Sequence, residues 1–414
     1  MNKKIFAGVI FLGLVVILIF VFSKGLVPGN VIAAELDDSQ STSEGVGQVV
    51  DGNNEFAFDL YNEWKNGDGN VFFSPYSIST ALAMTYEGAK GETSNQMRDV
   101  LNYPEDDLTR QSNFARIQNI LNKQDKEYKL HTANALWLQK DYSFLDSYLD
   151  VTQDYYYAEQ NELDFMNKNS EAVDTINGWV EDKTEDKIKD IISELSPDTR
   201  LVLTNAIYFK GDWLKEFDKD DTLGKPFITD SGVTSVDMMY QKEDFNYAET
   251  DELQILEMDY KGEELSMMVL LPKENYSLSD VEINNGNVES WSSSLVEEEV
   301  HVYFPKFEFD TKYGMVNTLN RMGMVDAFIP NQADFSGMEG SRELYIGNVI
   351  HQAYVKVDEK GTEAAAATVV GMVGSSMPSE NQIIFNADHE FVFLIKEKST
   401  GQILFLGKVV NPNE

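Results

Sequence analysis

The side chains that could catalyse a reaction are few in this 414-residue chain. It contains four histidines and no cysteine, which excludes a thiol nucleophile, a disulfide framework and a thiolate metal site. A serine hydrolase of the α/β type needs a Gly-x-Ser-x-Gly turn to expose its nucleophile, and the sequence has no such turn. The chain is therefore not predicted to be an enzyme, and no catalytic residue, metal ligand or cofactor is assigned.

The most informative stretch of the sequence lies near the C-terminus. Residues 355–358 alternate apolar and charged side chains, as a half-buried strand does, and Gly361 then interrupts the pattern. Small and β-branched residues follow, and no proline occurs before Pro378, so every backbone N–H up to that point is available to a sheet. With period 2, the even-numbered residues from Thr362 to Met372 share one face and Glu363 lies on the other.

These features predict a loop that could become a central strand. Two simpler interpretations remain: a plain hairpin strand, or the start of an alanine-rich helix with Thr362 as its cap and Glu363 in its first turn.

The first 34 residues are predicted to be a signal peptide or a membrane anchor. Residues 2–4 are polar and basic, and residues 5–22 form an uncharged apolar run of about the length of a minimal membrane span. Small residues before and at Ala33 and Ala34 suit cleavage by signal peptidase. Both alternatives predict an extracellular or cell-surface protein.

Composition divides the rest of the chain into two parts. Residues 35–50 are predicted to be a disordered acidic spacer, because polar, acidic and hydroxyl side chains dominate them. Residues 51–414 contain no internal repeat and no second linker, so one large domain is expected. With 70 acidic against 33 basic residues and a formal net charge of −37, binding to nucleic acid or to an anionic membrane is not expected.

Several segments that must position the C-terminal stretch carry long motifs. Residues 70–78 read N-V-F-F-S-P-Y-S-I, in which Ser74 is a natural helix N-cap and Pro75 takes the first helical position. Residues 204–213 read T-N-A-I-Y-F-K-G-D-W, a buried strand that ends at Trp213. Residues 333–338 read A-D-F-S-G-M, and residues 359–368 read E-K-G-T-E-A-A-A-A-T.

These motifs, in this order over about residues 53–412, resemble the serpin family, and the chain is identified as an inhibitory, prokaryotic-like member. The resemblance implies an α+β fold with three β-sheets, eight or nine helices and an exposed reactive-centre loop near the C-terminus. It also implies suicide inhibition from a metastable fold. A protease attacks the loop and forms an acyl-enzyme, and the cleaved loop then inserts into the central sheet as a new strand.

The resemblance also assigns roles to individual residues. The loop hinge comprises Glu359, Gly361, Thr362, Glu363, Ala364, Ala365, Ala366, Ala367 and Thr368. The region where the central sheet opens comprises Ser74, Ser77, Asn205, Trp213 and His351. Ordinary structural roles, such as helix capping for the two serines and core packing for Trp213, are compatible with these assignments.

The reactive bond is placed by counting forward from the hinge by the family's usual interval. The count gives Ser375-Ser376, with Ser376-Met377 as a one-residue alternative. A small residue before the bond favours a serine protease with a small apolar pocket, of the elastase or subtilisin kind.

The partners that the resemblance implies are few. The protein is expected to act as a monomer without a heparin-type cofactor, because the basic residues between 110 and 129 form no continuous stripe. Two other functions stay open: a non-inhibitory serpin that binds or carries another molecule, and an inhibitor of cysteine proteases.

Overall fold

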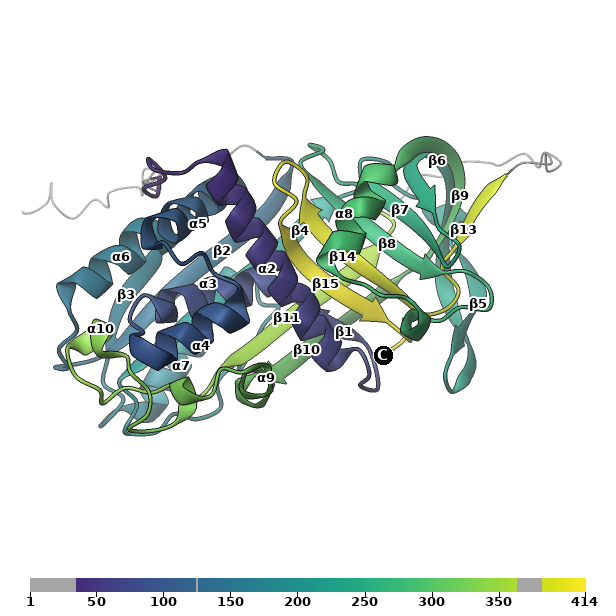
Figure 1. Ribbon diagram of the computed structural model, residues 1–414. Helices are drawn as coiled ribbons and strands as arrows, with labels where there is room; N and C mark the ends of the chain where they lie inside the picture. The colour runs from purple at the N-terminus through teal and green to yellow at the C-terminus, as the bar shows by residue number, and fades with distance from the viewer. Residues whose placement is uncertain (1–34, 124–125, 363–381) are drawn as a thin grey trace, which may run out of the picture. The chain divides into compact units, whose positions relative to one another are not determined.

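The computed structural model describes residues 35–123, 126–362 and 382–414. These residues form nine α-helices, α2 to α10, and fifteen strands, β1 to β15, in the numbering of Figure 1. The α+β class and the expected eight or nine helices are confirmed for this part of the chain. Within the described residues, no helix is both long and apolar enough to span a membrane. Residues 1–34, for which a signal or anchor was predicted, lie outside the described residues.

Six strands form the sheet that contains the start of the predicted hinge. Their order is β10, β11, β12, β4, β2, β3, and only the pair of β2 and β3 is parallel. The strands are β10 (Phe307–Gly314), β11 (Ile350–Asp358), β12 (Gly361–Thr362), β4 (Leu201–Asp212), β2 (Tyr128–Gln139) and β3 (Ala158–Leu163).

Nine further strands form a second hydrogen-bonded sheet. Their order is β1, β15, β14, β8, β7, β6, β9, β13, and β5 pairs with β6 off this path. They are β1 (Val71–Phe73), β15 (Ile403–Val409), β14 (Phe391–Glu397), β8 (Leu265–Pro272), β7 (Leu253–Asp259), β6 (Gly232–Glu249), β9 (Val296–Pro305), β13 (Ile383–Asn386) and β5 (Leu223–Thr229). The expected second and third sheets are continuous here, because the 18-residue β6 pairs with β5 at its beginning and with β7 at its end.

The helices cover both faces of the six-stranded sheet. Alternate residues of β2 point to opposite faces: Ala135 and Trp137 pack against α7 (Asn169–Lys183), whereas Leu136 belongs to the main core with α3 (Pro75–Tyr86). Figure 1 shows α3 to α6 together beside β2 and β3. The remaining helices are α2 (Ser43–Trp64), α4 (Gly91–Leu101), α5 (Asp107–Leu121), α6 (Asp146–Tyr156), α8 (Asn285–Ser294), α9 (Val316–Met322) and α10 (Ser336–Glu339).

Phenylalanine rings fill the space where the two sheets meet. Phe72 of β1 stacks on Phe405 of β15 with 5.3 Å between ring centroids, and it meets Phe309 of β10 edge-on at 6.4 Å. Phe307 of β10 lies 5.5 Å from Phe393 of β14. Aromatic pairs at these separations add to the stability that burial alone supplies, so this cluster holds the two sheets together.

The prediction that residues 35–50 form a disordered spacer is wrong. Leu36 is buried, its N–H donates to the Asn119 side chain at 3.0 Å, and its carbonyl accepts from the same amide at 3.1 Å. Thr42 then caps α2, because its hydroxyl accepts from the Gly45 N–H at 3.0 Å. Val49 and Val50 are buried in the main core. The polar composition hid a few apolar side chains that lie on the inner side of a helix.

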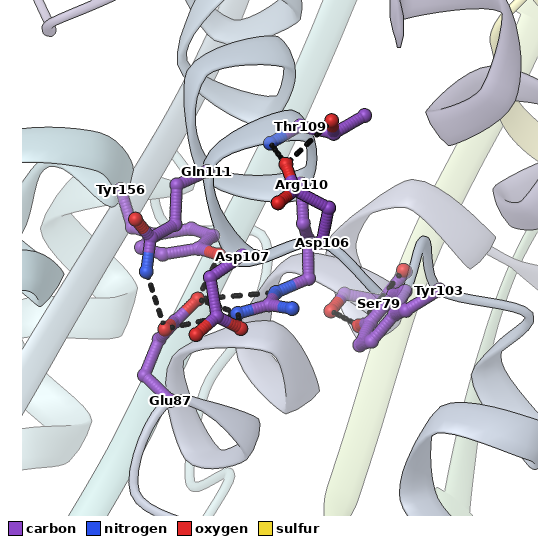
Figure 2. A network of polar contacts seen from close by, with 9 residues as sticks. All are labelled: Ser79, Glu87, Tyr103, Asp106, Asp107, Thr109, Arg110, Gln111 and Tyr156. Atoms are coloured by element: carbon purple, nitrogen blue, oxygen red, sulfur yellow. Dashed lines mark hydrogen bonds and ion pairs between the residues drawn. The ribbon is translucent and has the colours of Figure 1, made fainter.

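A buried ion pair joins three of the helices below the six-stranded sheet (Figure 2). Arg110 of α5 donates two hydrogen bonds to one oxygen of Glu87, the C-cap of α3, at 3.2 and 3.1 Å, and its side chain is only 1% exposed. Tyr156, the last residue of α6, donates to the same carboxylate at 2.7 Å. The ring of Tyr86 lies 4.4 Å from the guanidinium carbon.

We expect Arg110→Ala to destabilise the protein by about 3 kcal/mol, because it leaves a buried carboxylate without its counter-ion. For a chain of this size the midpoint of thermal unfolding should fall by about 4 °C. The double variant Arg110→Met/Glu87→Gln removes both charges and should unfold at a higher temperature than the single variant. An unchanged midpoint for Arg110→Ala would show that the pair contributes nothing to stability.

Candidate strand-insertion site

The start of the predicted hinge is already a strand of the six-stranded sheet. Gly361 and Thr362 form β12, which pairs on one side with Asp358 and Val357 of β11 and on the other with Asp212 and Gly211 of β4. Both pairings are antiparallel, so β11 and β4 run parallel to each other and are two strand spacings apart at this level, about 9.5 Å. That separation admits one strand.

Beyond β12 the two flanking strands continue without a ladder between them. Among the described residues, the stretch of β4 from 201 to 210 and the stretch of β11 from 350 to 356 pair only with their outer neighbours, β2 and β10. Each therefore presents one edge of backbone N–H and C=O groups toward the other. Such edges are the part of a sheet to which an additional strand binds.

Trp213 lies directly beside the hinge. Its indole N–H donates to the Asp358 carbonyl at 3.1 Å, and its backbone N–H donates to the Lys360 carbonyl at 2.7 Å. The Trp213 ring, which is 1% exposed, stacks on Tyr260 with 4.6 Å between centroids. The Tyr260 hydroxyl is 2.7 Å from the Thr362 hydroxyl, and burial raises the pKa of this phenol. Together the two aromatic residues hold the first residues of the hinge in place.

Glu359, in the turn between β11 and β12, forms an ion pair with Lys306, which directly precedes β10. Its carboxylate lies 3.0 Å from Lys306 Nζ and accepts a hydrogen bond from the Thr222 hydroxyl at 2.9 Å. Burial raises the pKa of this carboxyl, but the hydrogen bonds from its own backbone N–H, from Lys306 and from Thr222 outweigh burial and leave the pKa below its usual value. The Glu359 side chain is 4% exposed, so the turn between β11 and β12 is fixed by a half-buried charge pair.

A chain of hydrogen bonds lies farther along the same strands. The Ser77 hydroxyl donates to the Asn205 side-chain oxygen. The Asn205 amide donates to the Asn134 side-chain oxygen at 2.6 Å, and the Asn134 amide donates to the Tyr156 carbonyl at 2.5 Å. This network therefore ties the helix α3 to the strands β4 and β2, and through the end of α6 it reaches the buried ion pair of Arg110 and Glu87.

His351 of β11 joins the same helix start from the other side of the gap. Its Nε2 accepts a hydrogen bond from the backbone N–H of Ser74 at 3.0 Å. An accepting Nε2 must be unprotonated, so this histidine is neutral with its proton on Nδ1. Burial lowers the pKa of His351 from 6.5 to about 3. The Ser74 hydroxyl accepts from the Ser77 N–H at 3.1 Å and donates to the Leu404 carbonyl at 2.6 Å.

The five predicted sheet-opening residues thus fall into two groups. Ser74, Ser77, Asn205 and His351 lie together at the N-terminus of α3, on both sides of the gap. Trp213 lies apart from them, beside the hinge. Of the predicted hinge, Glu359, Gly361 and Thr362 are described. Residues 363–368 and the predicted reactive bond at Ser375, Ser376 and Met377 lie outside the described residues.

Sequence reasoning missed several residues of the site. Tyr260, Thr222 and Lys306 stand in segments for which the sequence suggested no role at the site. Asn134 faces Asn205 directly in the ladder of β2 and β4. A polar residue inside an otherwise apolar predicted strand was the signal that could have identified Asn134, because a buried amide requires a hydrogen-bond partner.

Comparison with known proteins identifies the family. The family model for serpins, described as serine protease inhibitors, matches residues 51–412. An uncharacterized serpin-like protein of Thermococcus kodakarensis is 43% identical over 369 residues, covering 88% of this chain and 86% of the relative. The leukocyte elastase inhibitor of Xenopus laevis is 40% identical over 372 residues, covering 86% of this chain and 97% of the relative.

Solved structures agree with this assignment. Human thyroxine-binding globulin, crystallised in complex with thyroxine, has a TM-score of 0.79 and is 33% identical, covering 89% of this chain and 100% of the globulin chain. The chain belongs to the serpin family. The resemblance drawn from the motifs is thereby confirmed at the level of family and fold.

The neutral state of His351 predicts acid sensitivity. Its pKa is about 3 in the folded protein and about 6.5 when unfolded, so its contribution to stability is complete above pH 6.5 and declines as the pH falls toward 3. At pH 5 the loss amounts to about 2 kcal/mol. In His351→Gln an amide oxygen can accept from Ser74 at every pH, so the fall in unfolding temperature between pH 7 and pH 5 should be smaller than in the wild type. Equal acid sensitivity of the two proteins would contradict the assignment.

Proposed function

We propose that this serpin inhibits serine proteases with a small apolar primary pocket by suicide trapping, in which its cleaved loop enters the six-stranded sheet. The observation that carries the proposal is the position of β12. Gly361 and Thr362 of the hinge already pair with both flanking strands, with Thr362 only 4% exposed, at the head of a gap that admits one strand.

The register of β12 indicates what an entering strand would meet. If its antiparallel ladders continue unchanged, residue 364 falls between Phe209 and Val355, and residue 366 falls between Ile207 and Ala353. All four of these neighbours are buried. Large side chains on the entering strand would clash in so dense a layer, and the sequence has alanine at both positions.

The same register gives polar partners to the polar residues of the loop. Thr368 would fall between Asn205 and His351, a polar pair on the same face of the sheet as the buried neighbours of residues 364 and 366. Glu363, on the outer face, would fall between Lys210 and Lys356, and it would share Lys356 with Glu308, which already pairs with that lysine at 2.9 Å. Opposite charges on neighbouring strands stabilise a sheet, so the acidic hinge residue favours insertion in this register.

The length of the loop also suits the gap. From Gly361 to Ser375 is about 14 steps, or roughly 46 Å as a strand, and the 12 residues of β4 span roughly 40 Å. A loop cut after Ser375 could therefore line the whole edge of β4. We propose Ser375-Ser376 as the reactive bond, with Ser376-Met377 as the alternative. The similarity to the frog leukocyte elastase inhibitor supports a small-pocket target.

We also propose that the protein acts as a monomer, outside the cytoplasm, and without a polyanionic cofactor. Among the described residues near α5, most of the basic side chains are already buried or paired. Arg110 is buried, whereas Arg116, Lys126 and Lys129 each make an ion pair with a carboxylate, of Asp38, Glu264 and Glu185 respectively. A polyanion would have to break these pairs in a strongly acidic protein.

A carrier function is the second candidate. The observation that favours it is the similarity to thyroxine-binding globulin, which was crystallised in complex with thyroxine. The two functions differ in the fate of the cut loop. An inhibitor keeps the protease as a covalent complex, whereas a carrier that does not trap proteases releases it and is simply nicked.

The test is to mix the full-length protein with subtilisin and with elastase and to separate the products on a denaturing gel. A covalent band near the summed mass, with the loop cut after Ser375 or Ser376, is expected. The cysteine protease papain tests the remaining alternative. Cleavage by all three enzymes without any covalent band would overturn the inhibitory function and favour the carrier.

Ala366→Arg provides a matched variant for this test. In the register of β12 its charge would enter the buried layer between Ile207 and Ala353 without a partner, at a cost of several kcal/mol. We expect the variant loop to be cut at the same bond and at a similar rate while the covalent band disappears. Ala366→Ser, which adds no charge and little volume, should retain the band. A full yield of complex from Ala366→Arg would show that the loop does not enter the sheet in this register.

The two lysines that flank the predicted position of Glu363 give a finer prediction. In Lys210→Gln/Lys356→Gln the hinge carboxylate loses both partners, so insertion should slow relative to hydrolysis. We expect more inhibitor molecules to be consumed for each protease trapped, by about twofold, since exposed pairs contribute below about 1 kcal/mol. The ratio is measured by titrating a fixed amount of protease. Glu363→Gln should show the same increase, and combining all three changes should add little.

A further inference from the structure

A cavity of about 500 Å³ lies where the chain re-enters the described fold after the predicted loop. Its lining includes Ile384 and Asn386 of β13, together with Lys273, Glu274 and Tyr276 from the turn that follows β8. Gln254 of β7, also in the lining, donates to the Ile384 carbonyl at 2.9 Å. The cavity is thus attached to the strand that directly follows the loop.

The floor of this cavity is a fixed polar arrangement. The Asp388 carboxylate accepts from the Asn386 amide at 2.6 Å and lies 2.9 Å from Nδ1 of His389. The other ring nitrogen of His389 is 2.8 Å from the Pro272 carbonyl. Burial lowers the pKa of His389, but these two hydrogen bonds outweigh it, so the pKa is raised above its usual value. The floor therefore joins the ends of β13 and β8.

The exposed carboxylates of the lining, those of Asp251 and Glu274, form the rim of the cavity. Unlike Asp388, they are not balanced by a neighbouring donor or positive charge in the described residues. Asp251 and Glu274 are exposed, and in the described part of the chain neither carboxylate has a hydrogen-bond or ion-pair partner. Lys273 is the one lysine of the lining, and it is paired with Glu249 at 3.0 Å. The same lining includes two exposed apolar side chains, Tyr276 (41%) and Ile384 (50%).

This combination fits a long basic side chain. An arginine or lysine has an apolar stem that could lie between Tyr276 and Ile384 while its charged end reaches Asp251 and Glu274. An arginine could also stack on the tyrosine ring. A free anion or an acidic partner would be repelled by the same rim.

A protease attached to the loop would be within reach of this cavity. Ser376 and Ile383, the first residue of β13, are about seven residues apart, which is at most about 25 Å of chain. A protease of some 250 residues is about 45 Å across. A protease that holds the reactive bond must therefore lie close to β13.

We propose that this cavity is a secondary docking site that receives a lysine or arginine side chain from the surface of the target protease. The site selects, among proteases able to cut the loop, those with a basic residue at the matching position. This inference rests on the proposed inhibitory function, and it adds a determinant of specificity outside the loop.

The experiment measures the second-order rate constant of inhibition. The probe is whichever of several small-pocket serine proteases, including subtilisin and elastase, the wild type inhibits fastest. For Asp251→Asn/Glu274→Gln we expect the rate constant to fall at least about threefold at low ionic strength and to approach the wild-type value in 0.5 M NaCl, because rim charges act mainly on association. The number of inhibitors consumed per protease should not change, since the hinge is untouched.

The matched control is Glu105→Gln/Asp150→Asn, which removes two exposed carboxylates outside the cavity and gives the same net charge. It should react like the wild type. Ile384→Ala, which shortens an apolar side chain of the lining, should slow inhibition at both salt concentrations. Equal rate constants for the rim variant and the control would overturn the docking site while leaving the inhibitory function intact. Absence of any covalent complex from the wild type would overturn both.

Discussion

The backbone hydrogen bonds of an incomplete sheet are the constraint on which this structure depends. Polar backbone groups in a protein interior need partners, yet among the described residues β4 and β11 present facing edges that only β12 joins, over two residues. A sheet of this kind can be completed by one more strand. Completion would add a ladder on each side and bury more apolar surface. Side chains from other elements hold β4 and β11 apart and in alignment.

Two polar clusters hold the strands at different levels. Beside the hinge, Trp213 and Tyr260 form hydrogen bonds with Asp358 and Thr362, respectively. The ion pair of Glu359 and Lys306 fixes the turn between β11 and β12. At the N-terminus of α3, Ser74 and Ser77 bind His351 on one strand and Asn205 on the other. Both serines belong to the helix cap, so a single local element contacts both edges of the gap. Insertion of a further strand, as proposed, would have to preserve or rearrange these hydrogen bonds on both sides of the gap.

Local motifs predicted most of the fold and half of the site. The Ser74-Pro75 pair placed the start of α3 because capping and proline preferences act within a few residues. The run after Gly361 predicted a strand precursor because alternation and the absence of proline are local properties. Tyr260, Thr222 and Lys306 could not be found in this way, since each meets the hinge only through the pairing of distant strands. The helical character of residues 43–50 was missed because the core that holds it comes from other elements.

The distribution of charge along the proposed path explains why an acidic hinge residue is compatible with insertion. A carboxylate entering a sheet in a protein of net charge −37 would ordinarily meet repulsion. The register of β12, continued by one residue, instead sets position 363 between Lys210 of β4 and Lys356 of β11, on the face away from the core. The next residue on that side of the strand, at 365, is already uncharged. In the proposed insertion this attraction, in which Lys356 is shared with Glu308 at 2.9 Å, would act at the first step of entry, where the fewest new backbone bonds have formed.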